Sequence, residues 1–135
     1  MTDWRHCIPE HKGDFAALTA ASQIGFPTLN PLLPEFLKWL RDGNWPVASP
    51  TAKLLGTASA EIVPHIEIVL RSDDFVWKYW VVTLLLPELK QNVLARLEAE
   101  MHRVTEHPTP DEKLEGVDEA ILDFLSNRND LPNAD

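Results

Sequence analysis

The side chains best suited to chemistry are five histidines and a single cysteine, and they are scattered along the chain. Glu98 and His102 are four residues apart, so a helix would let both reach one metal ion, but no third ligand follows at a metal-site spacing. Cys7 next to His6 could form a thiolate pair, yet no third group is placed to orient it. Glycine-rich phosphate loops and the serine nucleophile motif are absent as well. We therefore predict neither a metal site nor a catalytic residue.

Recognition by aromatic side chains is a second kind of chemistry, and it is indicated by the string Trp77-Lys78-Tyr79-Trp80. On a helix, Trp77 and Trp80 share a face with nearby apolar residues, which favours packing inside the protein. Lys78 can pair with Asp74 one helical turn earlier or lie against an aromatic ring. Lys78 and Tyr79 are also candidates for a recognition patch, because tyrosine and tryptophan are frequent hot spots of binding.

Trp45 and Phe75 occupy equivalent positions thirty residues apart. Each can pack against its neighbours at the start of a helix, with Asn44 as the cap before Trp45. If the two rings are exposed, they form an aromatic strip along one edge of the protein that would suit a partner. A different hypothesis places a small-molecule or catalytic pocket around Trp45, His65 and Lys78.

The formal charge of −9 is concentrated in the last third of the chain. Residues 1–85 contain 9 acids and 7 bases, a net charge of −2, whereas residues 86–135 contain 12 acids and 5 bases, a net charge of −7. Such a surface repels phosphate backbones, so we expect no nucleic-acid partner. The acids of the last expected helix either form a polar, solubilising end to the fold or steer a basic partner toward it. The acids concerned are Glu115, Asp118, Glu119 and Asp123.

These side chains must be positioned by helices, because the sequence nearly repeats itself every thirty residues. Leu33-Pro34 recurs as Val63-Pro64, and Leu40-Arg41 recurs as Leu70-Arg71. A fixed period of this size is typical of stacked pairs of helices, which bury their apolar faces only against one another. No segment of useful length alternates with a period of two, so we predict no sheet.

About seven helices are expected, separated by glycine, proline and capping residues such as those in Thr109-Pro110-Asp111-Glu112. Their approximate ranges are 14–24, 30–41, 45–55, 61–70, 75–86, 89–105 and 110–127. Residues 1–13 form a lead-in, 14–126 the repeat domain and 127–135 a polar tail. The inward-facing residues expected in the fifth and seventh helices are Trp77, Val81, Leu84 and Leu85, and Leu114, Val117, Ile121 and Phe124.

One unit is similar to a short HEAT-type repeat, in which an L-x-D turn is followed by V-x-x-x-A and then L-L-G. The residues that carry this likeness are Leu40-Arg41-Asp42, Val47, Ala52 and Leu54-Leu55-Gly56. The next unit departs from the pattern at Ser72, Trp77 and Leu86. The resemblance implies a curved, right-handed stack of antiparallel helix pairs.

Residues 4–126 also resemble a small bacterial family, domain-of-unknown-function family 5071. The segments that carry this likeness are Ile8-Pro9 with Lys12 and Asp14, Asn44 to Ala48, and Trp77 to Trp80. The resemblance implies a single HEAT-like, all-helical domain without an assigned activity. Its members look like small proteins found near bacterial toxin genes, which suggests an immunity or inhibitor role by association.

We therefore predict an all-α, HEAT-like α-solenoid that acts as a protein-interaction module and not as an enzyme, without a cofactor. Its most concrete form is a cytoplasmic, immunity-type inhibitor of a basic, toxin-like protein. The alternatives are an adaptor subunit and, from a different class, a small-molecule-binding domain or enzyme with the pocket near Trp45, His65 and Lys78. The sequence contains no run of about 18 apolar residues, the length needed to span a membrane, and its N-terminus lacks a signal-peptide pattern. The candidate partner-binding residues are Trp45, Phe75, Lys78, Tyr79, Glu115, Asp118, Glu119 and Asp123.

Overall fold

The computed structural model describes residues 3–130, with side chains up to Arg128, and every regular element in this range is helical. The α-helices are α1 (Phe15–Ile24), α2 (Leu33–Lys38), α3 (Ala48–Leu55), α4 (Val63–Leu70), α5 (Phe75–Trp80), α6 (Gln91–Ala95), α7 (Glu98–Glu106), α8 (Pro110–Glu115) and α9 (Val117–Asp130). The shorter elements are η1 (Arg5–Cys7), η2 (Asn30–Leu32), η3 (Ala60–Ile62), the π-helix η4 (Val81–Leu85) and η5 (Leu86–Glu88). None of the helices in the described range is long and apolar enough to cross a membrane.

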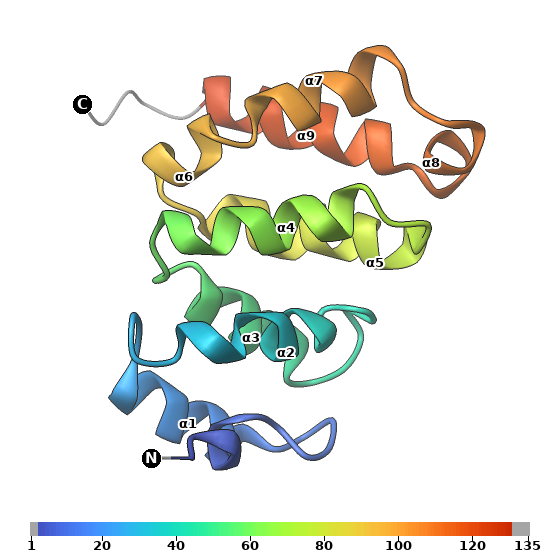
Figure 1. Cartoon of the computed structure of the whole chain (residues 1–135). Coiled ribbons are helices and arrows are strands. Elements are labelled where there is room, and N and C mark those ends of the chain that lie inside the picture. Colours follow the sequence, from blue (N-terminus) through green and yellow to red (C-terminus); the bar gives the residue numbers. More distant parts are fainter. Residues whose placement is uncertain (1–2, 131–135) are drawn as a thin grey trace.

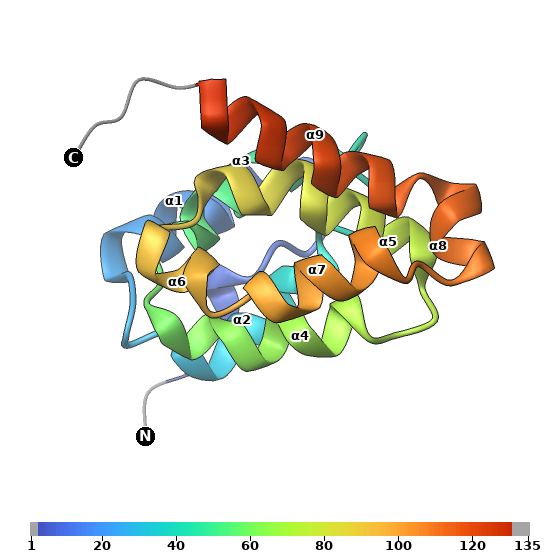
Figure 2. The same cartoon turned by 90° about the horizontal axis from the view of Figure 1, so that it is seen from above.

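The helices lie in layers that follow the order of the chain (Figure 1). α1 lies at one end, followed by α2 with α3, then α4 with α5, and finally α7 with α9. The view from above places α2, α4 and α7 in one row, and α3, α5 and α9 in a second row (Figure 2). Fully buried side chains such as Leu55, Ile66 and Leu85 form one continuous core between these elements.

The thirty-residue repeat expected from the sequence is visible in the first helices of two successive repeat units. η2 and η3 begin at Asn30 and Ala60, and α2 and α4 begin at Leu33 and Val63. The second halves differ: Asp42 accepts a hydrogen bond from the backbone N–H of Asn44 and holds a turn, so α3 begins only at Ala48. Asn44 is therefore not the helix cap that the sequence suggested. In the next unit, Asp74 caps α5 directly by accepting from the N–H of Trp77.

The described residues contain nine α-helices instead of about seven, because two expected helices are broken. The expected helix at 89–105 is divided into α6 and α7 by a turn at residues 96–97. The expected helix at 110–127 is divided at Gly116, whose φ of +78° is left-handed and ends α8. α9 then continues to Asp130, past the expected start of the tail, and residues 131–135 of that tail lie outside the described residues.

The left-handed turn at Gly116 also changes which side chains of the last expected helix face the core. Val117, Ile121 and Phe124 are buried as predicted, but Leu114, predicted to face inward, is 83% exposed. Glu112, which precedes the turn, is fully buried instead. The prediction of one continuous apolar face over residues 110–127 is wrong here, because α8 and α9 are separate helices with different directions.

The expected fifth helix changes its hydrogen-bonding pattern at Val81, where α5 gives way to η4. Val81 and Leu85 are buried as predicted, while Trp77 and Leu84 are only partly buried. The indole N–H of Trp77 donates to the carbonyl oxygen of Leu37 over 2.9 Å, which ties α5 to the end of α2. Trp77 therefore joins two layers of the fold and does not fill the centre of the core.

Gly43 packs so closely on Trp80 that a Cβ added at this position would overlap the indole ring. We predict that Gly43→Ala lowers the free energy of unfolding by about 1–3 kcal/mol, since the ring can move only by disturbing its neighbours. Gly13→Ala is the matched control, because the nearest atom to its added Cβ is 3.9 Å away. Urea denaturation would measure both variants, and equal midpoints would show that the Gly43–Trp80 contact is not tight.

Candidate binding groove

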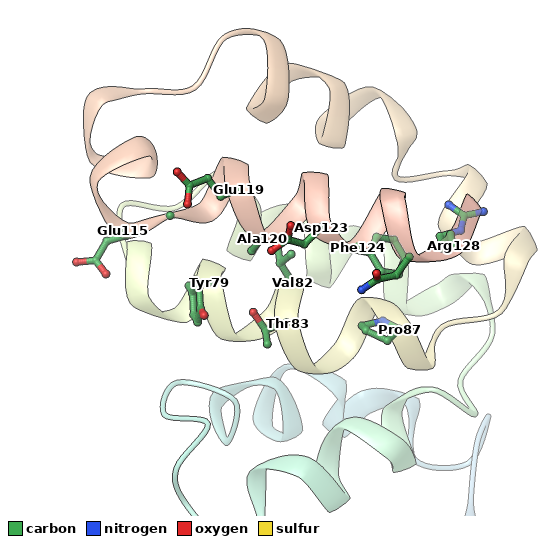
Figure 3. Close-up of a pocket in the computed structure, with 12 residues that line it drawn as sticks. Tyr79, Val82, Thr83, Pro87, Glu115, Glu119, Ala120, Asp123, Phe124 and Arg128 are labelled. Atoms are coloured by element: carbon green, nitrogen blue, oxygen red, sulfur yellow. The ribbon is translucent and has the colours of Figure 1, made fainter. Parts of the chain in front are cut away.

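A groove with a volume of about 560 Å³ runs between α9 and the segment from Tyr79 to Pro87 (Figure 3). One wall is formed by Tyr79, Val82, Thr83 and Pro87, and the other by Glu115, Gly116, Glu119, Ala120, Asp123, Phe124, Asn127 and Arg128. A volume of this size is typical of ligand-binding clefts in proteins. The groove contains both aromatic rings and carboxylates, so it can hold apolar and cationic groups together.

The first wall runs from α5 through the π-helix η4 to η5. Tyr79, Thr83 and Pro87 follow one another at four-residue spacing along the groove, while Val81 and Leu85 are buried in the core. π-helical turns are rare and occur frequently at functional sites. The ring of Tyr79 packs edge-on against Trp80 with 5.2 Å between the ring centres, which fixes its position at the groove.

The second wall carries the charge of the groove. Glu119 and Asp123 are four residues apart on α9, so they lie along the same side of that helix, and Glu115 at the end of α8 lines the same wall. None of these three carboxylates takes part in an ion pair with another described residue. Arg128 stacks over the ring of Phe124 at 5.5 Å and donates from Nη2 to Oε1 of Gln91 over 2.6 Å. Three carboxylates and one guanidinium leave the groove with a net negative charge.

Lys78 and Glu112, which lie close in sequence to residues of the groove, belong to a buried cluster of charges. Lys78 Nζ donates to Oε2 of Glu112 over 2.9 Å, and only 3% of Lys78 is exposed. Arg103 donates to both oxygens of the same carboxylate, over 3.1 and 2.7 Å. Because Lys78 precedes Tyr79 and Glu112 lies three residues before Glu115, this cluster ties one wall of the groove to the other.

The cluster keeps Glu112 ionised. Burial alone raises the pKa of Glu112, but hydrogen bonds from Arg103, from the backbone N–H of Thr109 and from Lys78 outweigh it, and the pKa falls from 4.5 to about 2. The hydrogen bond to Glu112 in turn raises the pKa of Arg103, against the opposing effect of burial. The Thr109 contact belongs to a capping box at the start of α8, as the sequence signature predicted.

A smaller cavity of about 370 Å³ opens onto this cluster. Its charged lining residues are Arg71, Lys78 and Arg103, and Asp73, Asp111 and Glu112. Glu100, next to the cavity, accepts from Arg103 over 2.7 Å and from Arg71 over 3.3 Å. Since cations and carboxylates are equally numerous in the lining, the cavity favours no ligand of a single charge sign.

Four of the predicted partner-binding residues meet in the groove, namely Tyr79, Glu115, Glu119 and Asp123. The sequence had placed them in two separate candidates, an aromatic patch and an acidic helix. Asp118 does not join them: it is only 8% exposed, because the break at Gly116 turns it inward, and its Oδ1 has no hydrogen-bond partner among the described residues. Lys78, expected at the surface, is buried with Glu112.

Trp45 and Phe75 lie outside the groove, and both are half-buried. Trp45 packs edge-on against Trp39 with 5.4 Å between the ring centres. Phe75 lies beneath the ammonium group of Lys78, with Nζ 4.8 Å from the ring centre. Neither Trp45 nor His65 lines the groove or the smaller cavity, so the structure gives no support to a pocket shared with Lys78.

Residues 3–130 contain no group of three or more histidine, cysteine, aspartate or glutamate side chains that could hold a metal ion. His102 lies 3.8 Å from Glu106 on the exposed side of α7. The Sγ of Cys7 is 3.7 Å from Nε2 of His6, but burial raises the pKa of the thiol and so disfavours a reactive thiolate.

Several residues of the site were missed by the sequence reasoning. Phe124 was assigned to the core alone, although its ring also lines the groove and supports Arg128. Thr83 is exposed in the wall of the groove, but a lone threonine belongs to no motif that would single it out. Glu112 carried a signal, its place in the capping sequence, but nothing in the sequence pointed to Lys78 and Arg103 as its partners.

The fold and the groove together define an all-helical protein with an acidic, aromatic-lined cleft at its C-terminal end. The family model described as Domain of unknown function (DUF5071) matches residues 7–125. The chain therefore belongs to the DUF5071 family, as its resemblance indicated. The match covers all of the groove residues except Asn127 and Arg128. A comparison with curated proteins gave no match.

The lowered pKa of Glu112 predicts that acid weakens the fold. The unfolded carboxylate protonates near pH 4.5 and the folded one near pH 2. The stabilisation is therefore fully present above about pH 4.5 and is lost as the pH falls toward about 2, by about 3 kcal/mol in total. Urea unfolding on both sides of this window would measure the loss.

Glu112→Gln separates this effect from general acid denaturation. This variant should be less stable at neutral pH and should lose less stability across the window, because it has no carboxylate to protonate. Glu98→Gln, on the exposed side of α7, should retain the wild-type pH dependence. If Glu112→Gln also retains it, the buried cluster does not control stability in acid.

Proposed function

We propose that this protein is a protein-interaction module whose groove binds a basic segment of another protein. The observation that supports this proposal best is the composition of the groove. It combines the rings of Tyr79 and Phe124 with the unpaired carboxylates described above in one cleft of about 560 Å³. A cationic side chain can lie against Tyr79 while it binds a carboxylate, so both features favour the same kind of ligand.

The charge of the whole chain acts in the same direction. A formal charge of −9 attracts a cationic partner over several ångströms and raises the rate of encounter. Electrostatic attraction of this kind affects association more than dissociation, whereas buried aromatic contacts determine how long the complex lasts. We therefore assign steering to the carboxylates and anchoring to Tyr79, which is half-buried, whereas Phe124 is only 8% exposed.

In this proposal the layered helices form a HEAT-like solenoid, and the groove lies in its last layer. The protein would act in the cytoplasm as an immunity-type inhibitor that covers a basic, toxin-like partner, which is the role suggested by the family resemblance. The enzyme hypothesis finds less support, because Lys78 is engaged by Glu112 and is almost completely buried. A nucleic-acid partner is disfavoured by the net negative charge.

The proposal is tested by neutralising the exposed acids of the groove with Glu115→Gln, Glu119→Gln and Asp123→Asn together. A partner is first captured from native-cell lysate with the wild-type protein. Its association with wild type and with this triple variant is then measured by surface plasmon resonance at low salt. We expect the variant to associate about tenfold more slowly, because electrostatic steering raises association rates by at least this factor, and to dissociate at a similar rate.

The matched control is the triple variant Glu10→Gln, Glu98→Gln and Glu106→Gln, which changes the net charge equally at exposed acids outside the groove. It should associate nearly as fast as wild type. Equal slowing in both variants would mean that total charge, and not the groove, attracts the partner. An unchanged rate in the groove variant would move recognition to Trp45 and Phe75.

A further inference from the structure

The charges of the groove are separated along its length. Figure 3 shows Glu115 and Glu119 near Tyr79 at one end, Asp123 in the middle, and Arg128 at the other end. The groove is therefore negative over most of its length and positive at one end. A ligand that carries only positive charge would match one end and be repelled at the other.

Arg128 presents its charge from a fixed position. Its guanidinium is held from one side by the ring of Phe124 and by a 2.6 Å hydrogen bond to Gln91, which belongs to α6. A side chain restrained by two contacts loses little further freedom when it meets a ligand. Arg128 is thus suited to bind an anionic side chain at its end of the groove.

Between the charged ends, the groove is lined by apolar groups from two helical walls. Ala120 of α9 is half-buried and Pro87 of η5 is exposed, whereas Val82 is fully buried. The walls run along helices, and the described residues contain no strand edge to which an extended peptide could add. Among the common modes of peptide recognition, a helix laid into a groove between two helices fits this geometry. Tyr79 to Pro87 span about 12 Å of helix, so two to three turns of a ligand helix would cover the groove.

We propose that the occupant of the groove is an amphipathic helix of the partner protein with its charges separated along its length. Its basic side chains lie beside Tyr79, Glu115 and Glu119, and an acidic side chain lies beside Arg128. The apolar face between them packs on Ala120 and Pro87. This inference rests on the proposed function and adds to it the structure and the charge order of the bound segment.

The test compares two synthetic helical peptides of about 16 residues, long enough to fold as isolated helices. Both have the same composition and the same leucine stripe. In the polarised peptide the glutamates occupy the first turn and the arginines the last turns, and in the mixed peptide the two alternate. We expect the polarised peptide to bind wild-type protein about fivefold more tightly, the effect of roughly one well-formed surface ion pair. Fluorescence anisotropy would measure both affinities, and circular dichroism would confirm equal helicity.

Arg128→Gln links the difference to one end of the groove. This variant should prefer the polarised peptide less than wild type does, because the partner of the glutamates is lost while the carboxylates still attract the clustered arginines. Arg96→Gln is the matched control: Arg96 is exposed at the end of α6, outside the groove, and its loss should leave the fivefold preference intact. If Arg128→Gln retains the full preference, or if Arg96→Gln abolishes it, the assignment to Arg128 is wrong.

The two proposals fail in different ways. In one outcome, wild type binds both peptides with equal affinity, and neutralising the groove acids abolishes the binding of both. This outcome overturns the separated-charge helix but supports a groove for basic segments. Failure of both peptides to bind also overturns the helix, and the association rates of the captured partner then decide on the groove independently. Perturbed amide resonances at residues 79–87 and 119–128 in NMR titrations would confirm that the polarised peptide lies in the groove.

Discussion

The buried carboxylate of Glu112 is the constraint on which the C-terminal half of this structure depends. A charge with no exposed surface must be compensated by partners of good geometry, and Lys78 and Arg103 supply them from α5 and α7. Three helices are thereby held in one arrangement. Loss of a single partner would leave an uncompensated charge in the interior, which typically costs about 3–5 kcal/mol.

Two departures from the regular α-helix lie along the groove. In one wall, the π-helix η4 holds Thr83 at the groove and Val81 and Leu85 in the core. In the other, the left-handed Gly116 separates α8 from α9, and Glu119 and Asp123 after it face the cleft. A straight helix through Gly116 would have aligned Glu115 differently relative to Glu119 and Asp123, so this break helps to shape the site.

Charge is divided in this protein between inside and outside. The buried cluster pairs each of its carboxylates with arginine or lysine, so its charges are used to hold the fold together. The carboxylates of the groove are left to the solvent at its mouth, and their field extends outward. This division explains how a chain with 12 basic and 21 acidic residues can be cross-linked internally by ion pairs and still present unpaired carboxylates to the solvent.

The sequence by itself determined the helical class, the family, the thirty-residue offset of the first half-units, and the helix N-caps Asp14, Asp74 and Thr109. These features depend on caps and on the spacing of apolar residues, and both can be recognised from residues that are neighbours in the sequence. Tertiary structure alone decided that Lys78 is buried against Glu112, 34 residues away, and that Tyr79 lines the same groove as Asp123. These contacts between distant residues depend on how the helices pack and where they break. The partner of a side chain across a core is set by the directions of both helices and not by the residues next to it in the sequence.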